Sequence, residues 1–160
     1  MNSINIISSS NIQEALNKIR ISKKTFPNLK IGLLGYDEEF NQKALKIKGA
    51  DILILNCNYR IENRINQRDS GLNESLCRLA KENNISIGIN IEEIKTKTKK
   101  EKAEFLSLLR QNVLLCKKTK CNLVFLNGKD EKALFSLLKL IGADTKSALE
   151  SISFLISKTK

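Results

Sequence analysis

The sequence predicts an α/β fold in which a parallel sheet is built from strand–helix repeats. Short apolar runs alternate with amphipathic segments about five times, and a pair of helices follows the last run. The third run, residues 51–56, is apolar on both faces, which fits a parallel strand that is covered on both sides. Alternation of this kind gives parallel strands joined by right-handed crossovers.

Five strands are too few for a closed eight-stranded barrel. The sequence therefore leaves two arrangements, a TIM-barrel-like (β/α) repeat that is incomplete and an open doubly wound sheet. Both arrangements bind ligands at the carboxyl ends of the strands. The 160 residues suit one domain, which we expect to cover residues 1–160.

In the first half of the chain, Asn11 and Asp37 are predicted N-caps, because side-chain oxygens of this kind accept from the first free N–H groups of a helix. The helix after Asn11 has apolar residues at helical spacing, and Gly49 is expected to end the helix after Asp37. The strands are predicted at residues 4–7, 29–34 and 51–56.

The longest irregular stretch, residues 57–69, carries Arg60, Arg64 and Arg68 at intervals of four. In a helix the three guanidinium groups would share one face, and in a loop they would spread over the edge of the sheet. Arginine suits bidentate contact with phosphate. The alternative is a solvated loop with local ion pairs to Glu62 and Asp69. We favour the phosphate-binding interpretation, because this stretch uses arginine in a chain that otherwise prefers lysine.

In the second half, the Ser70–Gly71 pair is predicted to begin a helix that ends at Asn83–Asn84. A lysine-rich linker, residues 95–100, is expected before a long helix that ends near Thr119. That helix has an apolar face that includes Leu114, and a basic face. Asp144 is a predicted N-cap. Strands are predicted at residues 85–90 and 122–126, and the final helices at 130–141 and 144–157.

The charge is concentrated in one part of the chain. Lysine and arginine number 28 against 17 aspartates and glutamates, a net charge of +11. Nine basic and two acidic residues lie between Lys95 and Lys120, whereas residues 51–94 contain five basic and seven acidic residues. A basic concentration of this kind is typical of proteins that bind nucleic acid or an anionic surface. The alternative is that these lysines and arginines form only a solvated helix face in a lysine-rich protein.

Several classes of function are disfavoured. The chain has no histidine, which excludes Ser–His and Cys–His nucleophile pairs and histidine metal sites. It has no glycine-rich phosphate-binding motif. Glu92 and Glu93 follow the fourth strand and could hold Mg²⁺ or act as acid and base, although a structural or solvent role is favoured. We therefore expect this chain to hold no metal and no catalytic residue.

The cysteines and the apolar runs bear on the compartment. The four cysteines, Cys57, Cys77, Cys116 and Cys121, have no paired metal-binding spacing and are expected to be buried thiols in a reducing compartment. No apolar run approaches the roughly 20 residues of a membrane span, and no signal peptide is visible. A cytoplasmic protein without membrane contact is expected.

The stretch from Arg68 to Asn90 reads R-D-S-G-L-N-E-S-L-C-R-L-A-K-E-N-N-I-S-I-G-I-N. It resembles the signature of ribonuclease P protein component 3, the archaeal and eukaryotic subunit with a TIM-barrel-like fold. In that family a basic turn leads into G-[IL]-N, a helix close to L-A-x-E-N, and a strand ending in I-N. Further similarity lies at residues 49–55, 110–115 with Lys117 and Lys118, 122–126, 140–143, Lys146 and 148–149, so that it extends over roughly residues 49–157.

The resemblance implies a protein subunit of ribonuclease P that binds the catalytic RNA and assists 5′-leader removal from precursor tRNA. It implies that the RNA performs the chemistry with Mg²⁺, that the chain contacts precursor tRNA indirectly, and that it pairs with other ribonuclease P protein subunits. The acidic residues 51–94 are a candidate face for a basic partner. The alternative is a small TIM-like or doubly wound enzyme that uses Glu92 or Glu93. The predicted RNA-binding residues are Arg60, Arg64, Arg68, Lys97, Lys99, Lys100, Lys102, Arg110, Lys117 and Lys118.

Overall fold

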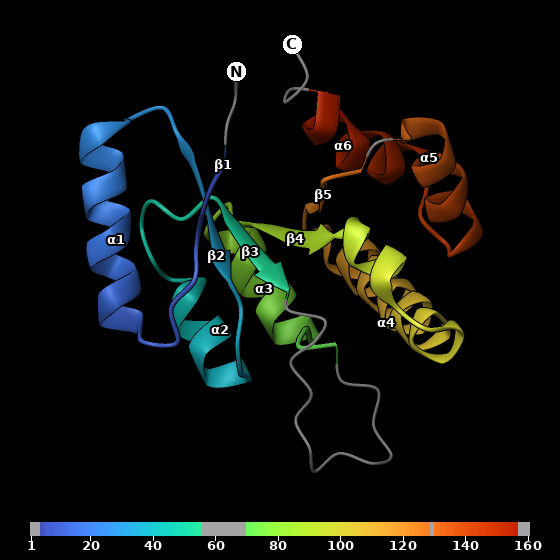
Figure 1. Cartoon of the computed structure of the whole chain (residues 1–160), viewed down its shortest axis with the longest axis horizontal. Coiled ribbons are helices and arrows are strands. Elements are labelled where there is room, and N and C mark those ends of the chain that lie inside the picture. The colour runs from blue at the N-terminus through green and yellow to red at the C-terminus, as the bar shows by residue number, and fades with distance from the viewer. Residues whose placement is uncertain (1–3, 56–69, 129, 157–160) are drawn as a thin grey trace.

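The computed structural model describes residues 4–55, 70–128 and 130–156. Within these ranges strands and helices alternate as the sequence predicts (Figure 1). The strands are β1 (Ile4–Ile7), β2 (Lys30–Leu34), β3 (Ile52–Leu55), β4 (Ser86–Asn90) and β5 (Leu123–Leu126). The helices are α1 (Ile12–Thr25), α2 (Glu38–Ala44), α3 (Glu74–Glu82), the 3₁₀ helix η1 (Ile91–Thr96), α4 (Lys99–Thr119), α5 (Glu131–Leu140) and α6 (Thr145–Ile156).

The described strands form one open parallel sheet in the order β1-β2-β3-β4-β5. A doubly wound sheet reverses its strand order at a switch point, and this sheet does not. Strands that follow one another in chain order, with right-handed crossovers, place their helices on a single face, as in a (β/α) barrel. The predicted α/β class is confirmed, and the sheet has the open, sequential arrangement of an incomplete TIM-like barrel.

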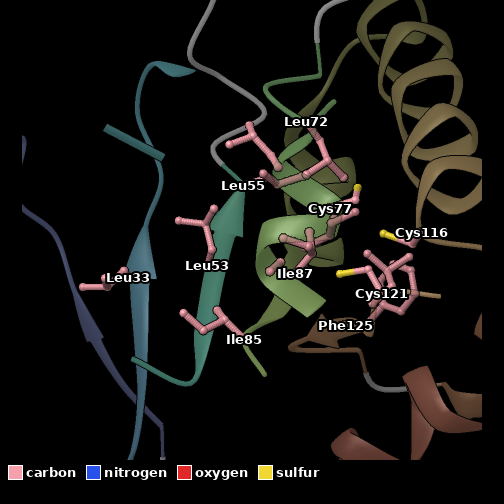
Figure 2. Packing of buried hydrophobic residues seen from close by; sticks show 14 of the residues in the cluster. Leu33, Leu53, Leu55, Leu72, Cys77, Ile85, Ile87, Cys116, Cys121 and Phe125 are labelled. Atoms are coloured by element: carbon pink, nitrogen blue, oxygen red, sulfur yellow. The ribbon is translucent and has the colours of Figure 1, made fainter. Parts of the chain in front are cut away.

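One face of the sheet packs against the helices and forms the main core. Leu33, Leu53, Ile87 and Phe125 point to this face from four neighbouring strands, and each is at most 1% exposed (Figure 2). Successive residues of a strand point to opposite sides, so the residues between them belong to the other face. In β3 and β5 every residue is buried, so both faces of the sheet are covered at these strands.

The second face has a smaller apolar cluster of its own, made of Ile52, Ile54, Val124 and Leu126. Gly32 and Gly88 make room for two of these side chains. A Cβ on Gly88 would lie 2.7 Å from Cγ2 of Ile52, and a Cβ on Gly32 would lie 2.8 Å from Cδ1 of Ile54. Both distances are below normal van der Waals contact, so the packing of this face requires glycine on β2 and β4.

Two predicted helix boundaries are wrong. The N-cap of α3 is Asn73, whose Oδ1 accepts from the Leu76 N–H at 2.9 Å, and not Ser70. Gly71 has a φ of +72° and turns the chain before the helix can begin. Helix α2 ends at Ala44 rather than at Gly49, because residues 45–49 form turns.

Helix α6 packs against β5, whose strand partner within the described ranges is β4 (Figure 1). Asp144 caps this helix as predicted, since its Oδ1 accepts from the Ser147 N–H at 2.9 Å. That hydrogen bond holds the pKa of Asp144 below its usual range. In the described part of the chain, every helix is too short or too polar to cross a bilayer.

Candidate nucleic-acid interface

Helix α4 carries most of the predicted basic residues, and its start is well defined. Thr98 and Glu101 form a capping box in which the Thr98 hydroxyl accepts from the Glu101 N–H and the Glu101 carboxylate accepts from the Thr98 N–H at 2.8 Å. The helix therefore begins at Lys99. The prediction of a linker at residues 95–100 is wrong. Its first two residues belong to η1 and its last two to the first turn of α4.

One face of α4 is buried against the rest of the protein from Phe105 to Thr119. Its buried residues are Phe105, Leu109, Asn112, Val113, Cys116 and Thr119. The predicted basic residues of this helix lie on the remaining surface. Leu114, which the apolar pattern assigns to the core, is 42% exposed and lies on the basic side. The exposed members of the predicted set are Lys99, Lys100, Lys102, Arg110, Lys117 and Lys118.

Lys97 differs from the other predicted lysines because it is half-buried. Its ammonium lies 5.9 Å from the centroid of the Phe105 ring, a cation–π arrangement that joins the segment before α4 to the first buried residue of the helix. Its charge also acts on the nearby Glu93 carboxylate. Lys97 therefore has a structural role besides any contact with a ligand.

The C-terminal part of α4 is tied to its neighbours by the same lysines that are predicted to bind RNA. Lys118 Nζ donates to Glu74 of α3 at 2.6 Å, and Lys117 Nζ donates to the carbonyl of Gly142, between α5 and α6, at 3.3 Å. Arg78 also donates to Glu74, at 2.6 Å. These hydrogen bonds, that of Lys118 first, hold the pKa of Glu74 below its usual range. One carboxylate thus faces two cations, and the cluster keeps a net positive charge.

Three of the seven acidic residues between positions 51 and 94 form ion pairs within the described part of the chain. Asp51 pairs with Lys23 at 3.2 Å and Glu92 pairs with Lys95 at 2.8 Å. Glu74 likewise faces Lys118 and Arg78. These three carboxylates are therefore already paired within the chain, and Glu62 and Asp69 lie outside the described residues.

The two glutamates after β4 do not converge. They lie in η1, where Glu92 turns to Lys95 and Glu93 turns toward Asn90 and Lys97. Burial raises the pKa of Glu93, and the charge of Lys97 and a hydrogen bond with Asn90 lower it by less. Oε2 of Glu93 is buried without a hydrogen-bond partner. Among the described residues no group of three acidic or cysteine side chains could hold a metal ion.

Several polar residues at the carboxyl ends of the strands were missed by sequence reasoning. Asn127, with φ of 62°, donates to Asn90 Oδ1 at 3.3 Å and so joins the ends of β4 and β5. Asn41 is 1% exposed; its Oδ1 accepts from the Tyr36 N–H at 3.0 Å and its Nδ2 lies 3.5 Å from the Gly71 carbonyl oxygen. Asn41 precedes Leu45 by one turn on the apolar side of α2, and this position is the signal that could have identified it as buried.

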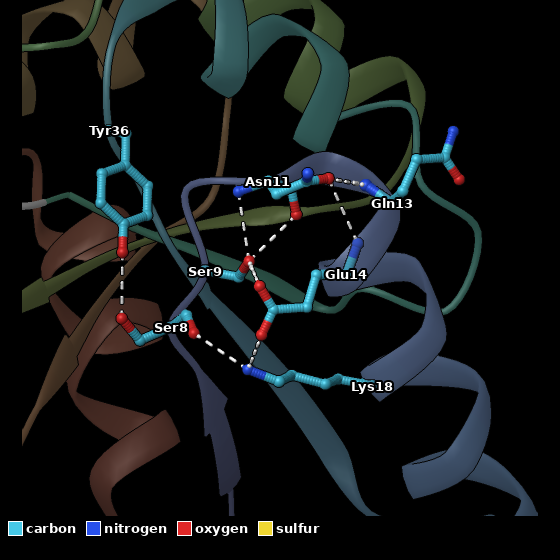
Figure 3. A network of polar contacts seen from close by, with 7 residues as sticks. All are labelled: Ser8, Ser9, Asn11, Gln13, Glu14, Lys18 and Tyr36. Atoms are coloured by element: carbon cyan, nitrogen blue, oxygen red, sulfur yellow. Dashed lines mark hydrogen bonds and ion pairs between the residues drawn. The ribbon is translucent and has the colours of Figure 1, made fainter.

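The carboxyl end of β1 is closed by a network of short polar side chains (Figure 3). Ser8 Oγ and the Tyr36 hydroxyl lie 3.0 Å apart, and Ser9 donates to Glu14 at 2.8 Å. Hydrogen bonds from Lys18 first, and then from Ser9, hold the pKa of Glu14 below its usual range. The polar side chains at the end of β1 are therefore used in structural hydrogen bonds with one another.

A cavity of about 520 Å³ lies at the opposite end of the sheet, near the starts of β2, β4 and β5. Its lining includes Lys30, Ser86, Asn122 and residues of α6. Two of the cysteines, Cys116 and Cys121, also line it. Barrel enzymes hold their catalytic residues at the carboxyl ends of the strands, so the position of this cavity is not that of an active site of this type.

The cysteines in the described ranges are free and buried, as predicted: Cys77, Cys116 and Cys121 (Figure 2). A hydrogen bond from Cys116 lowers the pKa of Cys77, whereas the contacts with Cys121 and Cys77 and the burial raise the pKa of Cys116. Cys57 and the three arginines Arg60, Arg64 and Arg68 lie outside the described residues.

No protein-family model and no curated protein matches the sequence. The fold is similar to that of a chain in the cryo-EM structure of archaeal ribonuclease P with mature tRNA. The two chains superpose with a TM-score of 0.74 at 21% sequence identity. The similarity covers 98% of this chain and 66% of the other, so this chain spans just under two thirds of its neighbour's length.

Proposed function

We propose that this chain is a protein subunit of ribonuclease P that binds RNA through α4 and the residues just before it. The observation that carries the proposal is the similarity in fold, over 98% of this chain, to a chain of an archaeal ribonuclease P complex. The motif between Arg68 and Asn90 and the exposed basic residues of α4 support the same function independently.

In this proposal the RNA component performs the cleavage with its own Mg²⁺, and the chain neutralises phosphates and braces RNA helices. Its partners are the ribonuclease P RNA, other ribonuclease P protein subunits and, indirectly, precursor tRNA. The specific component is protein component 3, and the expected compartment is the cytoplasm. Binding should be mainly electrostatic, so that log affinity falls with log salt by about 0.9 per neutralised phosphate on a B-form duplex.

The test is reconstitution of precursor-tRNA cleavage from the RNA component and the other protein subunits, with and without this chain. We expect 5′-leader removal to be faster with the chain than without it. A variant in which Lys99, Lys100, Lys117 and Lys118 are changed to glutamine should be slower than the unmodified chain. A matched control changes two lysines on another surface, Lys46 and Lys48, both exposed beyond the end of α2. Equal rates with and without the chain would remove the proposal.

One observation favours a second candidate, an enzyme that uses Glu93. This carboxyl group is half-buried, has a raised pKa and lies at the carboxyl end of β4, where barrel enzymes place acids and bases. Against it stand the position of the cavity at the other end of the sheet and the divergence of Glu92 from Glu93. RNA-free protein incubated with precursor tRNA and Mg²⁺ separates the two: cleavage that is lost in a Glu92→Gln, Glu93→Gln variant would favour the enzyme.

A further inference from the structure

Helix α4 carries two pairs of adjacent lysines, and the second pair occupies the same two positions around the helix axis as the first. Lys99 and Lys100 lie in its first turn, and Lys117 and Lys118 lie in its last turn. The pairs are separated by 18 positions, which is about five full turns at 3.6 residues per turn and about 27 Å along the axis. Lys117 therefore lies directly along the axis from Lys99, and Lys118 from Lys100. All four residues are exposed.

The surface between the pairs is free of carboxylates. Ala103 and Ser107 are small, and Arg110 and Leu114 follow them on the same side of the helix. At about 100° per residue, Glu101 projects roughly 150° from the middle of this surface, and Glu104 lies at its border, roughly 90° from the middle and about 40° from the line through Lys100 and Lys118. Glu101 is also turned back onto Thr98 in the capping box. A polyanion lying along this side meets positive charge at both ends and no negative charge between them.

The distance between the pairs is fixed by the fold. The capping box fixes the first turn, and the last turn ends in a Schellman arrangement in which the Cys121 N–H donates to the Cys116 carbonyl at 3.0 Å past Lys120 in the left-handed conformation. The contacts of Lys117 with Gly142 and of Lys118 with Glu74 hold the second pair in place. Because both pairs belong to one continuous helix whose inner face is buried from Phe105 to Thr119, the distance between them is set by the helix.

We propose, on the basis of the function proposed above, that α4 binds double-stranded RNA and that its two lysine pairs contact phosphate groups about one turn of the duplex apart. A fixed spacing on the protein selects a ligand that holds its phosphates at a fixed spacing, as an RNA stem does and a flexible single strand does not. Side chains reach an A-form helix from its wide, shallow minor groove and from the phosphates on both sides of it. Small residues in the middle of α4 allow that approach.

The proposal predicts a minimum stem length. Hairpins with stems of about 6, 10 and 16 base pairs, the last being the span of known double-stranded RNA-binding domains, are compared in filter binding with the full chain. We expect affinity to increase at least tenfold between the shortest and the longest stem, with most of the increase between the two shorter stems. A single strand of the same length as the longest hairpin should bind like the shortest hairpin.

Variants of the two pairs provide the second arm of the test. Lys99→Gln, Lys100→Gln and, separately, Lys117→Gln, Lys118→Gln should each lower the salt slope on the longest stem by about two, since each phosphate contact contributes about one. On the shortest stem either variant should bind within about twofold of the unmodified chain, because one pair remains. The control variant, Lys46→Gln, Lys48→Gln, should leave both stems unaffected.

The outcomes separate this inference from the proposed function. Affinity that grows smoothly with length, or equal binding of single strand and hairpin, would overturn the role of the spacing while leaving RNA binding intact. Absence of binding to any RNA by the full chain would instead remove the proposed function. A circular dichroism spectrum for each variant shows whether α4 is still folded, so that loss of binding is not confused with loss of the helix.

Discussion

Lys118 of α4 donates a hydrogen bond to Glu74 of α3 at 2.6 Å, although the two residues are 44 positions apart in the chain. The ion pair fastens the last turn of the basic helix to the first turn of its neighbour. It is exposed, with 66% of the lysine side chain accessible, so its contribution to stability is small. Its larger effect is to place a negative charge beside the proposed RNA-binding surface.

We expect Glu74→Gln to strengthen RNA binding. The change removes the carboxylate that faces both Lys118 and Arg78, and so releases two cations to a phosphate ligand. Affinity at moderate salt should rise several-fold and the salt slope should become steeper. Filter binding measures both. Glu82→Gln, at the other end of α3 and exposed, is the matched control. Weaker binding by Glu74→Gln would mean that the pair positions Lys118 rather than masking it.

A change of Gly88 to alanine should destabilise the second face of the sheet by about 1–3 kcal/mol, the usual cost of overpacking. The new methyl group would lie 2.7 Å from Cγ2 of Ile52. Gly32→Ala should cost less, because its nearest atom is the terminal Cδ1 of Ile54. Urea unfolding measures both changes.

Double variants that pair each glycine change with a smaller side chain opposite it identify the atoms that cause the overpacking. Ile54→Val removes Cδ1 and should relieve part of the cost of Gly32→Ala. Ile52→Val keeps Cγ2 and should give no relief to Gly88→Ala. Equal relief in both pairs would show that the sheet adjusts as a whole instead of at these contacts.

The position of the α3 cap can be tested directly. Asn73→Ala should destabilise the protein by about 1 kcal/mol, the usual cost of losing an N-cap. Asn73→Asp keeps the capping oxygen but replaces the amide that donates to Glu38 at 2.6 Å by a second carboxylate, so it should recover only part of this loss. Ser70→Ala should have an effect within about 0.5 kcal/mol. Thermal or urea unfolding distinguishes these outcomes. If Ser70→Ala destabilised the protein more than Asn73→Ala, Ser70 would be the N-cap of α3.

Glu93 should make stability depend on pH in a direction opposite to that of an ion-paired carboxylate. Burial raises the pKa of Glu93 in the folded protein, so the unfolded chain loses this proton at lower pH. The protonated Glu93 therefore contributes fully to the free energy of unfolding below the pKa of the unfolded chain. This contribution is lost as the pH rises through the pKa of the folded protein.

Glu93→Gln should therefore flatten the pH dependence of stability above the ordinary glutamate pKa of about 4.3. The measurement is the urea midpoint across this range. Glu92→Gln, which changes an ion-paired and more accessible carboxylate, is the control. An unchanged pH profile in Glu93→Gln would show that the group is solvated in the folded state.

Arg60, Arg64 and Arg68 carry a prediction that rests on the sequence. Changing all three to lysine keeps the charge and removes the guanidinium fork. Processing of precursor tRNA by the reconstituted complex should become slower, while the salt slope of RNA binding stays the same. Arg20→Lys, at an exposed position of α1, is the control. If the triple variant processes as fast as the unmodified chain, the three arginines have no specific contact with the RNA.

The positions of the strands along the chain could be predicted from the sequence, because short apolar runs bounded by polar and turn residues mark buried strands. Residues 4–7 were predicted to the residue, and the other strands to within one. The sheet order could not be obtained in this way. Crossovers of one length allow both a sequential and a doubly wound order, and tertiary packing decides between them.

The candidate site was predicted less well, for identifiable reasons. The lysine-rich stretch at residues 95–100 was interpreted as a linker from its charge, although Thr98 and Glu101 already have capping-box spacing. Leu114 was assigned to the core by its apolarity, yet it lies on the same side of α4 as Arg110. The contact between Asn90 and Asn127 joins residues 37 positions apart, and no local pattern contains that information.

The sequential strand order has a consequence for how the chain is made. Each new strand pairs with the one synthesised immediately before it, so the sheet can grow in the direction of translation without waiting for distant segments. At any stage the growing edge is the most recent strand, which is the part of a nascent sheet most open to wrong pairing. Among the described elements, α6 is synthesised after β5 and packs against it, so the helix that covers this strand follows the strand itself.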